Sequence, residues 1–277
     1  MERRPAIVQD NIGKIKQDAK LKNWKKNIIL FLTSQSISLF GSSLVQYAII
    51  WYITINTKSG IMMTISTICG FLPQLLISFL GGVWADRYNK KYIIAISDSV
   101  IAISTLIVAF FFVSGVESIW ILFVALAIRS FGAGIQTPTV NAIIPNLAPQ
   151  EKLMRINGVN TTIQSIMLIL SPAAAGAIMP MLPIGYILFI DVITAIIGVG
   201  VLVIGVKYKH IKNTDSKQKG YFSSIVEGLK YVKSHQFIKR FLIYYAIITV
   251  LIAPIRNINS FNGNTNFWGR GLEAYFK

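Results

Sequence analysis

Long apolar stretches alternate with short polar segments along the sequence. An α-helix needs about 20 apolar residues to cross the hydrocarbon core of a bilayer, and six of these stretches are long enough. They predict membrane-spanning helices near residues 27–55, 61–83, 92–113, 119–137, 159–181 and 184–206. A shorter stretch near residues 237–255 predicts the start of a seventh helix. The pattern therefore predicts an all-α membrane protein.

The composition agrees with a place in the membrane and argues against an enzyme. Of the 277 residues, 53% are hydrophobic and 14% are charged, whereas a soluble domain is about 25% charged. The sequence contains no Ser/His/Asp arrangement, phosphate-binding loop or metal-ligand spacing. We therefore expect no enzymatic activity, no cofactor and no metal site. Cys69 is the one cysteine, which excludes a disulfide within the chain.

The basic residues predict how the chain is oriented. The formal net charge is +16, but the basic residues lie between apolar stretches and accompany no nucleic-acid-binding motif, so we expect no nucleic-acid partner. Of the 27 Lys and Arg residues, most lie before the first helix, between helices two and three, between helices four and five, and after helix six. Short basic loops stay in the cytoplasm. This distribution predicts a multi-pass protein of the plasma membrane with a cytoplasmic N-terminus.

The polar segments also divide the chain into parts. We assign residues 1–26 to a cytoplasmic N-terminal segment, 27–206 to a six-helix transmembrane bundle, 207–240 to a cytoplasmic connector, 241–255 to a partial seventh helix and 256–277 to a tail. Within the connector, apolar residues recur at helical spacing between Phe222 and Val232. This spacing predicts an amphipathic helix at the membrane surface, and a solvated basic linker is the alternative.

The segment between helices two and three carries the most specific motif. Residues 82–91 read Gly-Val-Trp-Ala-Asp-Arg-Tyr-Asn-Lys-Lys, and we call them the signature loop. Gly82, Asp86, Arg87, Lys90 and Lys91 resemble the loop that joins the second and third helices in the major facilitator superfamily. That family has a second glycine where this chain has Asn89, a residue that tolerates positive φ. The resemblance implies the N-terminal half of a twelve-helix transporter, with an inverted repeat of three plus three helices, and an Asp-Arg pair that latches one conformation.

Three charged residues lie inside the apolar stretches, where charges are costly. Arg129 and the glycines after it are similar to a fourth-helix motif of the superfamily, and this resemblance implies proton coupling. The alternative is an arginine held by carbonyl groups or a carboxylate, which joins helices. We expect Asp98 to belong to the charge network of the signature loop. Asp191 either carries a proton as an unpaired acid or extends to the outer surface.

Polar and small residues in the other helices suggest a cavity. The amides of Gln35, Gln46, Asn160 and Gln164 would face a cavity at lower cost than lipid. In the fifth helix, Ser171, Pro172 and Gly176 form a short run that is similar to the Gly-Pro motif of drug antiporters, with Ser171 in place of glycine. Small residues there allow close approach of helix backbones.

The order of these segments is similar to that of the macrolide efflux proteins of Gram-positive bacteria. The resemblance rests on Asp-Arg-Tyr-Asn-Lys-Lys, on Arg-Ser-Phe-Gly-Ala-Gly-Ile-Gln-Thr-Pro and on Ile-Pro-Asn-Leu-Ala-Pro. It implies antibiotic resistance by an antiporter that exports a hydrophobic drug, a macrolide, in exchange for protons across the lipid bilayer. The substrate class follows from the resemblance alone.

The composition changes abruptly after Pro254. One permitted set of codons from Ile258 onward, read one base later, encodes a plausible continuation of a macrolide efflux protein. This suggests an out-of-frame tail and a transporter truncated to its N-terminal half, inactive without the missing C-terminal half or another transporter. The alternative is a stand-alone membrane protein that associates with, or regulates, a complete transporter.

Overall fold

The computed structural model describes residues 24–208 and the single positions 234, 236, 240 and 244. The predicted cytoplasmic segment before residue 24 lies outside the described residues. So do the amphipathic helix of the connector, most of the partial seventh helix and the tail after Pro254. The predictions about these parts of the chain therefore stay predictions.

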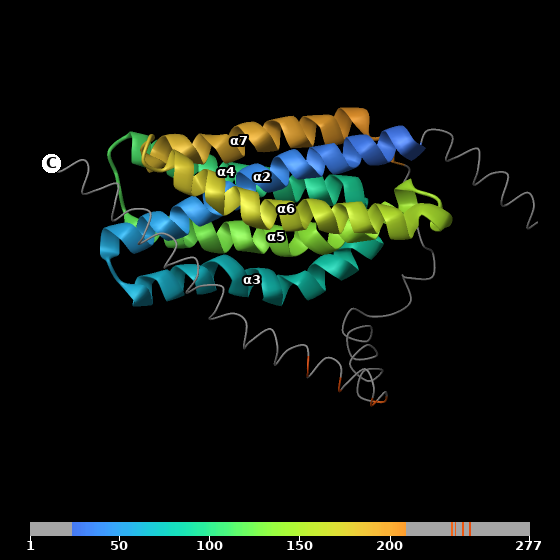
Figure 1. Cartoon of the computed structure of the whole chain (residues 1–277), viewed down its shortest axis with the longest axis horizontal. Helices are drawn as coiled ribbons and strands as arrows, with labels where there is room; N and C mark the ends of the chain where they lie inside the picture. The colour runs from blue at the N-terminus through green and yellow to red at the C-terminus, as the bar shows by residue number, and fades with distance from the viewer. Residues whose placement is uncertain (1–23, 209–233, 235, 237–239, 241–243, 245–277) are drawn as a thin grey trace, which may run out of the picture. The chain divides into compact units, whose positions relative to one another are not determined.

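The described part of the chain consists of helices joined by short turns, without strands (Figure 1). The six long helices are α2 (Trp24–Thr57), α3 (Gly60–Arg87), α4 (Lys90–Val113), α5 (Ile119–Leu147), α6 (Leu153–Ile178) and α7 (Ile184–Gly200). A 3-10 turn (Gln150–Lys152) precedes α6, and a π-helical turn (Val201–Gly205) follows α7. All six helices are long and apolar enough to cross a membrane, which confirms the predicted fold class.

Two helix boundaries differ from the prediction. The fourth helix does not end near residue 137 but continues to Leu147, with Pro138 and Pro145 inside it. Proline disfavours a helix in water. Inside a membrane bundle no water can hydrogen-bond an unwound backbone, so the helix continues and neighbouring groups satisfy the carbonyl that the proline leaves unbonded. The fifth helix, α6, begins at Leu153 rather than near residue 159, because the segment of mixed polarity with Arg155, Asn157 and Gly158 is helical as well.

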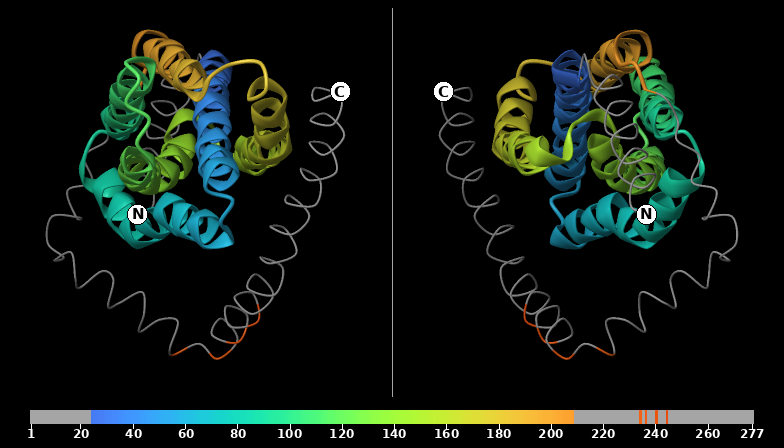
Figure 2. Two further views of the ribbon diagram at one scale, coloured as in Figure 1. Left: turned by 90° about the vertical axis from the view of Figure 1, so that its left-hand side faces the viewer. Right: turned by 90° about the vertical axis from the view of Figure 1, so that its right-hand side faces the viewer.

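The helices pack in a pattern that is unchanged when α2, α3 and α4 exchange places with α5, α6 and α7. The edge helix α3 packs chiefly on α5, and the other edge helix, α6, packs chiefly on α2. Similarly, α4 packs on α5 and α7 packs on α2, while α4 and α7 pack on each other. Figure 2 shows α6 and α7 on either side of α2. The main helix contacts therefore agree with two sets of three helices, while the inverted relation between the sets stays a prediction.

Apolar and glycine contacts hold the bundle together. One buried cluster, around Leu44, Leu122 and Leu188, lies toward one end, and a second, around Phe31 and Ile143, lies toward the end that carries the signature loop. Glycines bring α3 and α5 into backbone contact. A Cβ atom on Gly81 would lie 2.7 Å from the carbonyl oxygen of Gly134, and one on Gly134 would lie 2.8 Å from that of Gln74. A side chain at either position would push the two helices apart.

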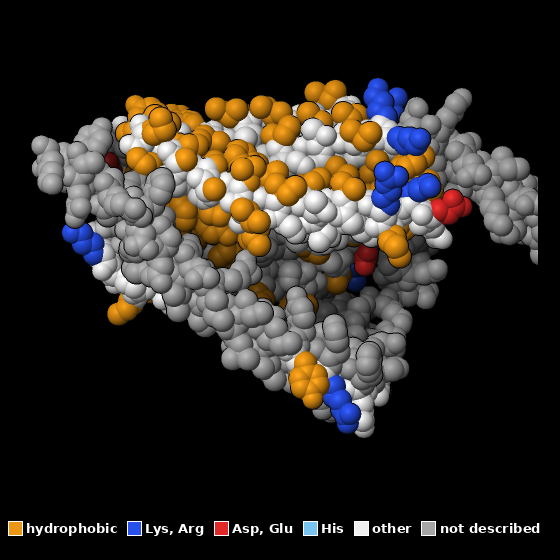
Figure 3. Space-filling model, in the orientation of Figure 1, with side chains coloured by type: hydrophobic (Ala, Val, Ile, Leu, Met, Phe, Trp, Pro, Cys, Tyr) orange, Lys and Arg blue, Asp and Glu red, His pale blue; other side chains and the backbone are white. Residues whose placement is uncertain are grey.

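The outer surface separates apolar and basic side chains. Ile65, Phe79, Ile103 and Ile196 are among the many large apolar side chains that are exposed along the helices. Figure 3 shows Lys and Arg side chains gathered at one end of the bundle, while apolar side chains cover its length. Such a surface suits lipid along the helices and water at the basic end.

Candidate functional site

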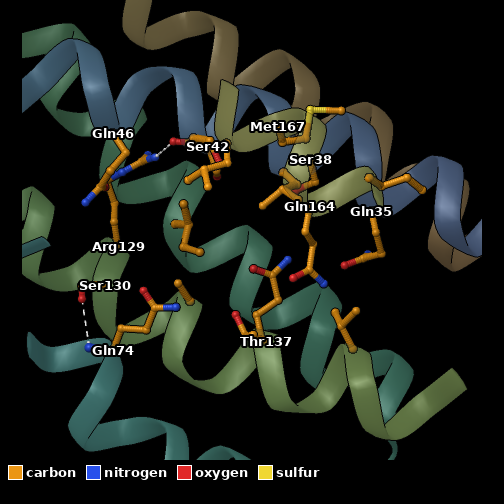
Figure 4. Close-up of a pocket in the computed structure, with 18 of the residues that line it drawn as sticks. Gln35, Ser38, Ser42, Gln46, Gln74, Arg129, Ser130, Thr137, Gln164 and Met167 are labelled. Carbon is orange, nitrogen blue, oxygen red and sulfur yellow. Dashed lines mark hydrogen bonds between the residues drawn. The ribbon is translucent and has the colours of Figure 1, made fainter. Parts of the chain in front are cut away.

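A cavity of about 330 Å³ lies within the bundle, between α2, α3, α5 and α6. All four amide residues that the sequence analysis singled out, Gln35, Gln46, Asn160 and Gln164, lie on its wall. Figure 4 shows the Gln35 and Gln164 side chains extending into the cavity from α2 and α6. The sequence analysis missed Gln74, Gln136 and Ser130, which also line it. The same signal, a polar residue within an apolar helix, could have found them.

Arg129 and Asp191 form a buried ion pair beside this cavity. Only 3% of the Arg129 side chain and none of the Asp191 side chain is exposed. The expectation that Asp191 is unpaired, or extends to the outer surface, is therefore wrong. The pair lies deep in the bundle because α5 and α7 turn these two side chains toward each other, an orientation that spacing along one helix does not reveal.

Two hydroxyl side chains complete the Arg129–Asp191 network. Ser42 donates a hydrogen bond to Asp191 Oδ1 (2.8 Å), and Thr105 donates one to Asp191 Oδ2 (2.8 Å). Arg129 donates to the Thr105 hydroxyl through Nη1 and to the Ser42 backbone carbonyl through Nη2. Figure 4 shows the second of these bonds as a dashed line. The network therefore joins α2, α4, α5 and α7.

Asp98 lies apart from the signature loop, contrary to expectation. Its side chain is 2% exposed, and its Oδ1 atom accepts hydrogen bonds from Ser38 and Gln136, each at 2.7 Å. Its Oδ2 atom is buried without a hydrogen-bond partner. Within the described residues Asp98 has no ion pair, because Arg129 is paired with Asp191. Asp98 is thus a buried acid held by two neutral side chains that themselves line the cavity.

Side chains of the cavity wall also hold α3 where Pro73 interrupts it. The backbone carbonyl of Gly70 accepts a hydrogen bond from Gln46 Nε2 (3.3 Å). The backbone N–H of Gln74 donates one to the Ser130 hydroxyl (2.9 Å; Figure 4). These bonds lie on either side of the proline. Neighbouring helices therefore satisfy backbone groups beside Pro73 within the continuous helix α3, as is usual in membrane bundles.

The run that resembles the antiporter motif lies in α6. Pro172 is inside this helix, and the Ser171 hydroxyl is buried without a hydrogen-bond partner among the described residues. A Cβ atom on Gly176 would lie 3.1 Å from the Trp51 ring of α2. Gly176 therefore allows α6 to approach α2 closely. No hydrogen bond among the described residues explains why a serine stands at position 171.

Most of the signature loop is helical, and the turn between its two helices is short. Gly82, Asp86 and Arg87 belong to the end of α3, and Lys90 and Lys91 begin α4, so that only residues 88 and 89 lie between the helices. Asn89 does not use a positive φ. Its φ is −69°, and its side chain accepts a hydrogen bond from the Lys91 amide at the start of α4. Asn89 thus serves as an N-cap, a position that asparagine favours.

The charged residues of the signature loop have different surroundings. Asp86 and Arg87 are exposed and Lys90 is buried. Lys91 donates hydrogen bonds to the backbone carbonyls of Val203 (2.9 Å) and Val206 (2.7 Å), at the end of the π-helical turn. A cation at the C-terminal end of a helix is favourable. Lys91 therefore connects the signature loop to the π-helical turn that follows α7.

A tyrosine packs at the same end of the bundle. Burial raises the pKa of Tyr208 above its usual range, and a hydrogen bond to its hydroxyl from Asn146 (3.4 Å) partly offsets this effect. The segment that follows α7 and its π-helical turn therefore stays packed against α5 as far as residue 208.

Comparisons with known proteins place these features in context. Residues 31–268 match the family described as the Major Facilitator Superfamily. The chain is 29% identical over 252 residues to macrolide efflux protein A of Streptococcus pyogenes, covering 88% of this chain and 62% of the relative. It is 28% identical over 214 residues to macrolide efflux protein A of Enterococcus faecalis, covering 74% and 65%.

A further relative carries a different name. The staphyloferrin A transporter of Staphylococcus aureus is 24% identical over 151 residues, covering 54% of this chain and 38% of the relative. The chain thus spans less than two thirds of the length of each of these three curated relatives. The family match continues past Pro254 to residue 268, so the out-of-frame tail stays a prediction.

Proposed function

Because the chain belongs to the Major Facilitator Superfamily, we propose that it forms part of an exporter of macrolide-type antibiotics, driven by proton entry across the plasma membrane. The superfamily consists of transporters rather than enzymes, and the six helices make the chain a multi-pass membrane protein. The observation that carries the proposal is the cavity of about 330 Å³ with a polar wall inside an apolar bundle. That volume is at the lower end for a site that binds a drug-sized molecule.

Macrolides enter the proposal through the relatives. The two relatives with the highest identity named above are macrolide efflux proteins, and the staphyloferrin A transporter matches a smaller part of the chain. The features that support export of a small molecule are the cavity and the buried charges beside it, because charged groups within a membrane mark paths for substrates and ions.

Asp98 is our candidate for the proton-binding group. Arg129 neutralises Asp191, whereas Asp98 has two neutral hydrogen-bond donors and a free Oδ2 atom. A proton bound at Oδ2 would remove a buried charge that no cation balances. Ser38 and Gln136 contact both Asp98 and the cavity, so that a change in the charge of Asp98 would alter the cavity wall.

We further propose that these 277 residues supply one side of the substrate path and export little drug alone. In this superfamily, alternating access moves one half of the transporter against the other around a shared site. The chain spans 62% of the length of the Streptococcus pyogenes relative, and the helices described here correspond to one such half. The remaining part of that relative would provide the opposite wall.

The proposed function can be tested by macrolide accumulation in a bacterial host that lacks other exporters. We expect little change with the chain alone. Fusion to the C-terminal part of the Streptococcus pyogenes relative that the chain does not cover should produce energy-dependent efflux. This efflux should stop when a protonophore dissipates the proton gradient. Lowered accumulation with the unmodified chain would show that the chain forms a working path by itself, and efflux that persists without the gradient would exclude proton coupling.

The proposed orientation places Asn89 in the cytoplasm and Lys58 outside the cell, because Lys and Arg gather at the signature-loop end. The test uses Cys69→Ala as a background, with Asn89→Cys or Lys58→Cys added; Lys58 is exposed and Asn89 is half-buried between α3 and α4. An impermeant maleimide should label position 58 in intact cells, and position 89 only after permeabilisation. Labelling of position 89 but not of position 58 in intact cells would reverse the orientation.

A further inference from the structure

The cavity wall contains no carboxylate side chain among the described residues. Both buried acids lie behind it: Asp98 is covered by Ser38 and Gln136, and Asp191 is covered by Arg129 and Ser42. The one charged side chain on the wall is Arg129, and its charge is balanced by Asp191. An organic cation in this cavity would therefore meet a balanced arginine and neutral side chains, without a carboxylate to compensate for its lost hydration.

The same wall offers unused hydrogen-bonding groups. Gln46 and Gln136 are already bonded, to the Gly70 carbonyl and to Asp98. The carboxamides of Gln35, Gln74 and Gln164 make no side-chain hydrogen bond within the part of the chain that the structure describes, and they come from α2, α3 and α6. Gln35 is the most confined of the three, because it is 8% exposed and its buried Nε2 atom has no partner, whereas Gln74 is half-buried and Gln164 is exposed.

The buried Gln35 amide without a hydrogen bond is costly, and a ligand that supplies the bond recovers that cost. The less buried Gln74 and Gln164 amides offer further hydrogen bonds to the same ligand. A carboxamide offers two N–H donors and an oxygen acceptor. It therefore suits hydroxyl, ether and carbonyl oxygens. It provides no charge, so it gives a lipophilic cation without such groups little to bind.

We propose that this cavity binds the uncharged, oxygen-rich part of its ligand through the carboxamides of Gln35, Gln74 and Gln164, and discriminates against organic cations that lack hydrogen-bonding groups. This inference rests on the proposed function, since it takes the cavity as the substrate site. It adds the chemistry of recognition: hydrogen bonds from three helices, rather than an ion pair, select the ligand.

The experiment measures binding to the 277-residue chain in lipid nanodiscs with three radiolabelled probes. Digoxin is an uncharged lactone glycoside, tetraphenylphosphonium is a cation without hydrogen-bonding groups, and erythromycin is a macrolide. We expect the unmodified chain to bind digoxin more tightly than tetraphenylphosphonium. If tetraphenylphosphonium binds as tightly as digoxin, or if neither oxygen-rich probe binds, the proposal is wrong.

Substitutions then test the named side chains. Gln35→Leu and Gln164→Leu should each weaken digoxin binding about 3- to 10-fold, as expected for the loss of a hydrogen bond. Asn157→Leu is the matched control, because Asn157 is an exposed amide on α6 outside the cavity lining, and it should have little effect. If both glutamine variants bind digoxin like the control, the assignment fails.

A variant that gains binding guards against loss of binding by misfolding. Gln35→Glu places a carboxylate on the wall and should tighten tetraphenylphosphonium binding while weakening digoxin binding. Unchanged cation binding by this variant would contradict the proposal. The erythromycin result separates this inference from the proposed function. Binding of digoxin without erythromycin would support the cavity chemistry and remove macrolides. Erythromycin binding that neither glutamine variant weakens would support macrolides as ligands and contradict recognition by these glutamines.

Discussion

Replacing Arg129 by Ala is expected to lower the free energy of unfolding by about 3–5 kcal/mol, the usual cost of removing one partner of a buried ion pair. The variant leaves Asp191 fully buried with only the Ser42 and Thr105 hydroxyls as donors. It also removes the bond from α5 to the Ser42 carbonyl of α2. The measurement is the thermal midpoint of the detergent-solubilised protein, followed by fluorescence-detected size-exclusion chromatography.

Two variants control this experiment. Arg155→Ala makes the same chemical change at an exposed position and should leave the midpoint nearly unchanged. Arg129→Leu combined with Asp191→Leu removes both charges and should recover part of the loss, because no uncompensated charge stays buried. If Arg129→Ala is as stable as Arg155→Ala, the ion pair does not hold the bundle together.

Replacing Asp98 by Asn in an active, full-length form is expected to abolish efflux driven by the proton gradient while leaving the protein in the membrane. Asparagine keeps an oxygen that can accept from Ser38 and Gln136, but it cannot release a proton. It therefore resembles the protonated acid permanently. Efflux should be measured in vesicles with an imposed pH gradient, beside the exchange of labelled for unlabelled drug without a gradient.

Exchange separates coupling from folding in this experiment. If Asp98 binds the coupling proton, the Asn variant should retain exchange and lose only the response to the gradient. Glu151→Gln is the matched control, since Glu151 is an exposed acid in the turn before α6, and it should behave like the unmodified protein. Normal gradient-driven efflux by Asp98→Asn would assign the proton to another group.

The fold was predictable because apolar length decides which segments cross a membrane. The errors arose at a proline and at a segment of mixed polarity. The predicted end of the fourth helix near residue 137 falls directly before Pro138, but α5 continues past this proline to Leu147. The first two turns of α6 mix apolar residues with Arg155, Asn157 and Gly158, which interrupt the apolar stretch, yet they are helical. Hydropathy locates the part of a helix that lies in lipid, and it does not locate the helix ends beyond it.

The candidate site was predictable only as a set of residue types. Polar residues in apolar helices identified Gln35, Gln46, Asn160 and Gln164, and the structure places all four on one cavity. Partners were not predictable, because pairing depends on how each helix is rotated. Arg129 pairs with Asp191, which is 62 residues away in the sequence, while Asp98 takes two neutral partners. A charge count along single helices contains none of this information.

The packing exchange between the two sets of three helices also determines where the bundle can deform. The edge helices α3 and α6 each pack chiefly on one neighbour, and each contains a proline: Pro73 near the middle of α3 and Pro172 in the last third of α6. Bending α6 at Pro172 disturbs fewer contacts than bending any other helix, whereas bending α3 at Pro73 would separate its glycine contacts with α5. Bending α2, α4, α5 or α7 would break the Arg129 network. The bundle is thus a stiff four-helix frame with α3 fixed to one side and α6 as its one compliant member, and the cavity lies between the frame and these two edge helices.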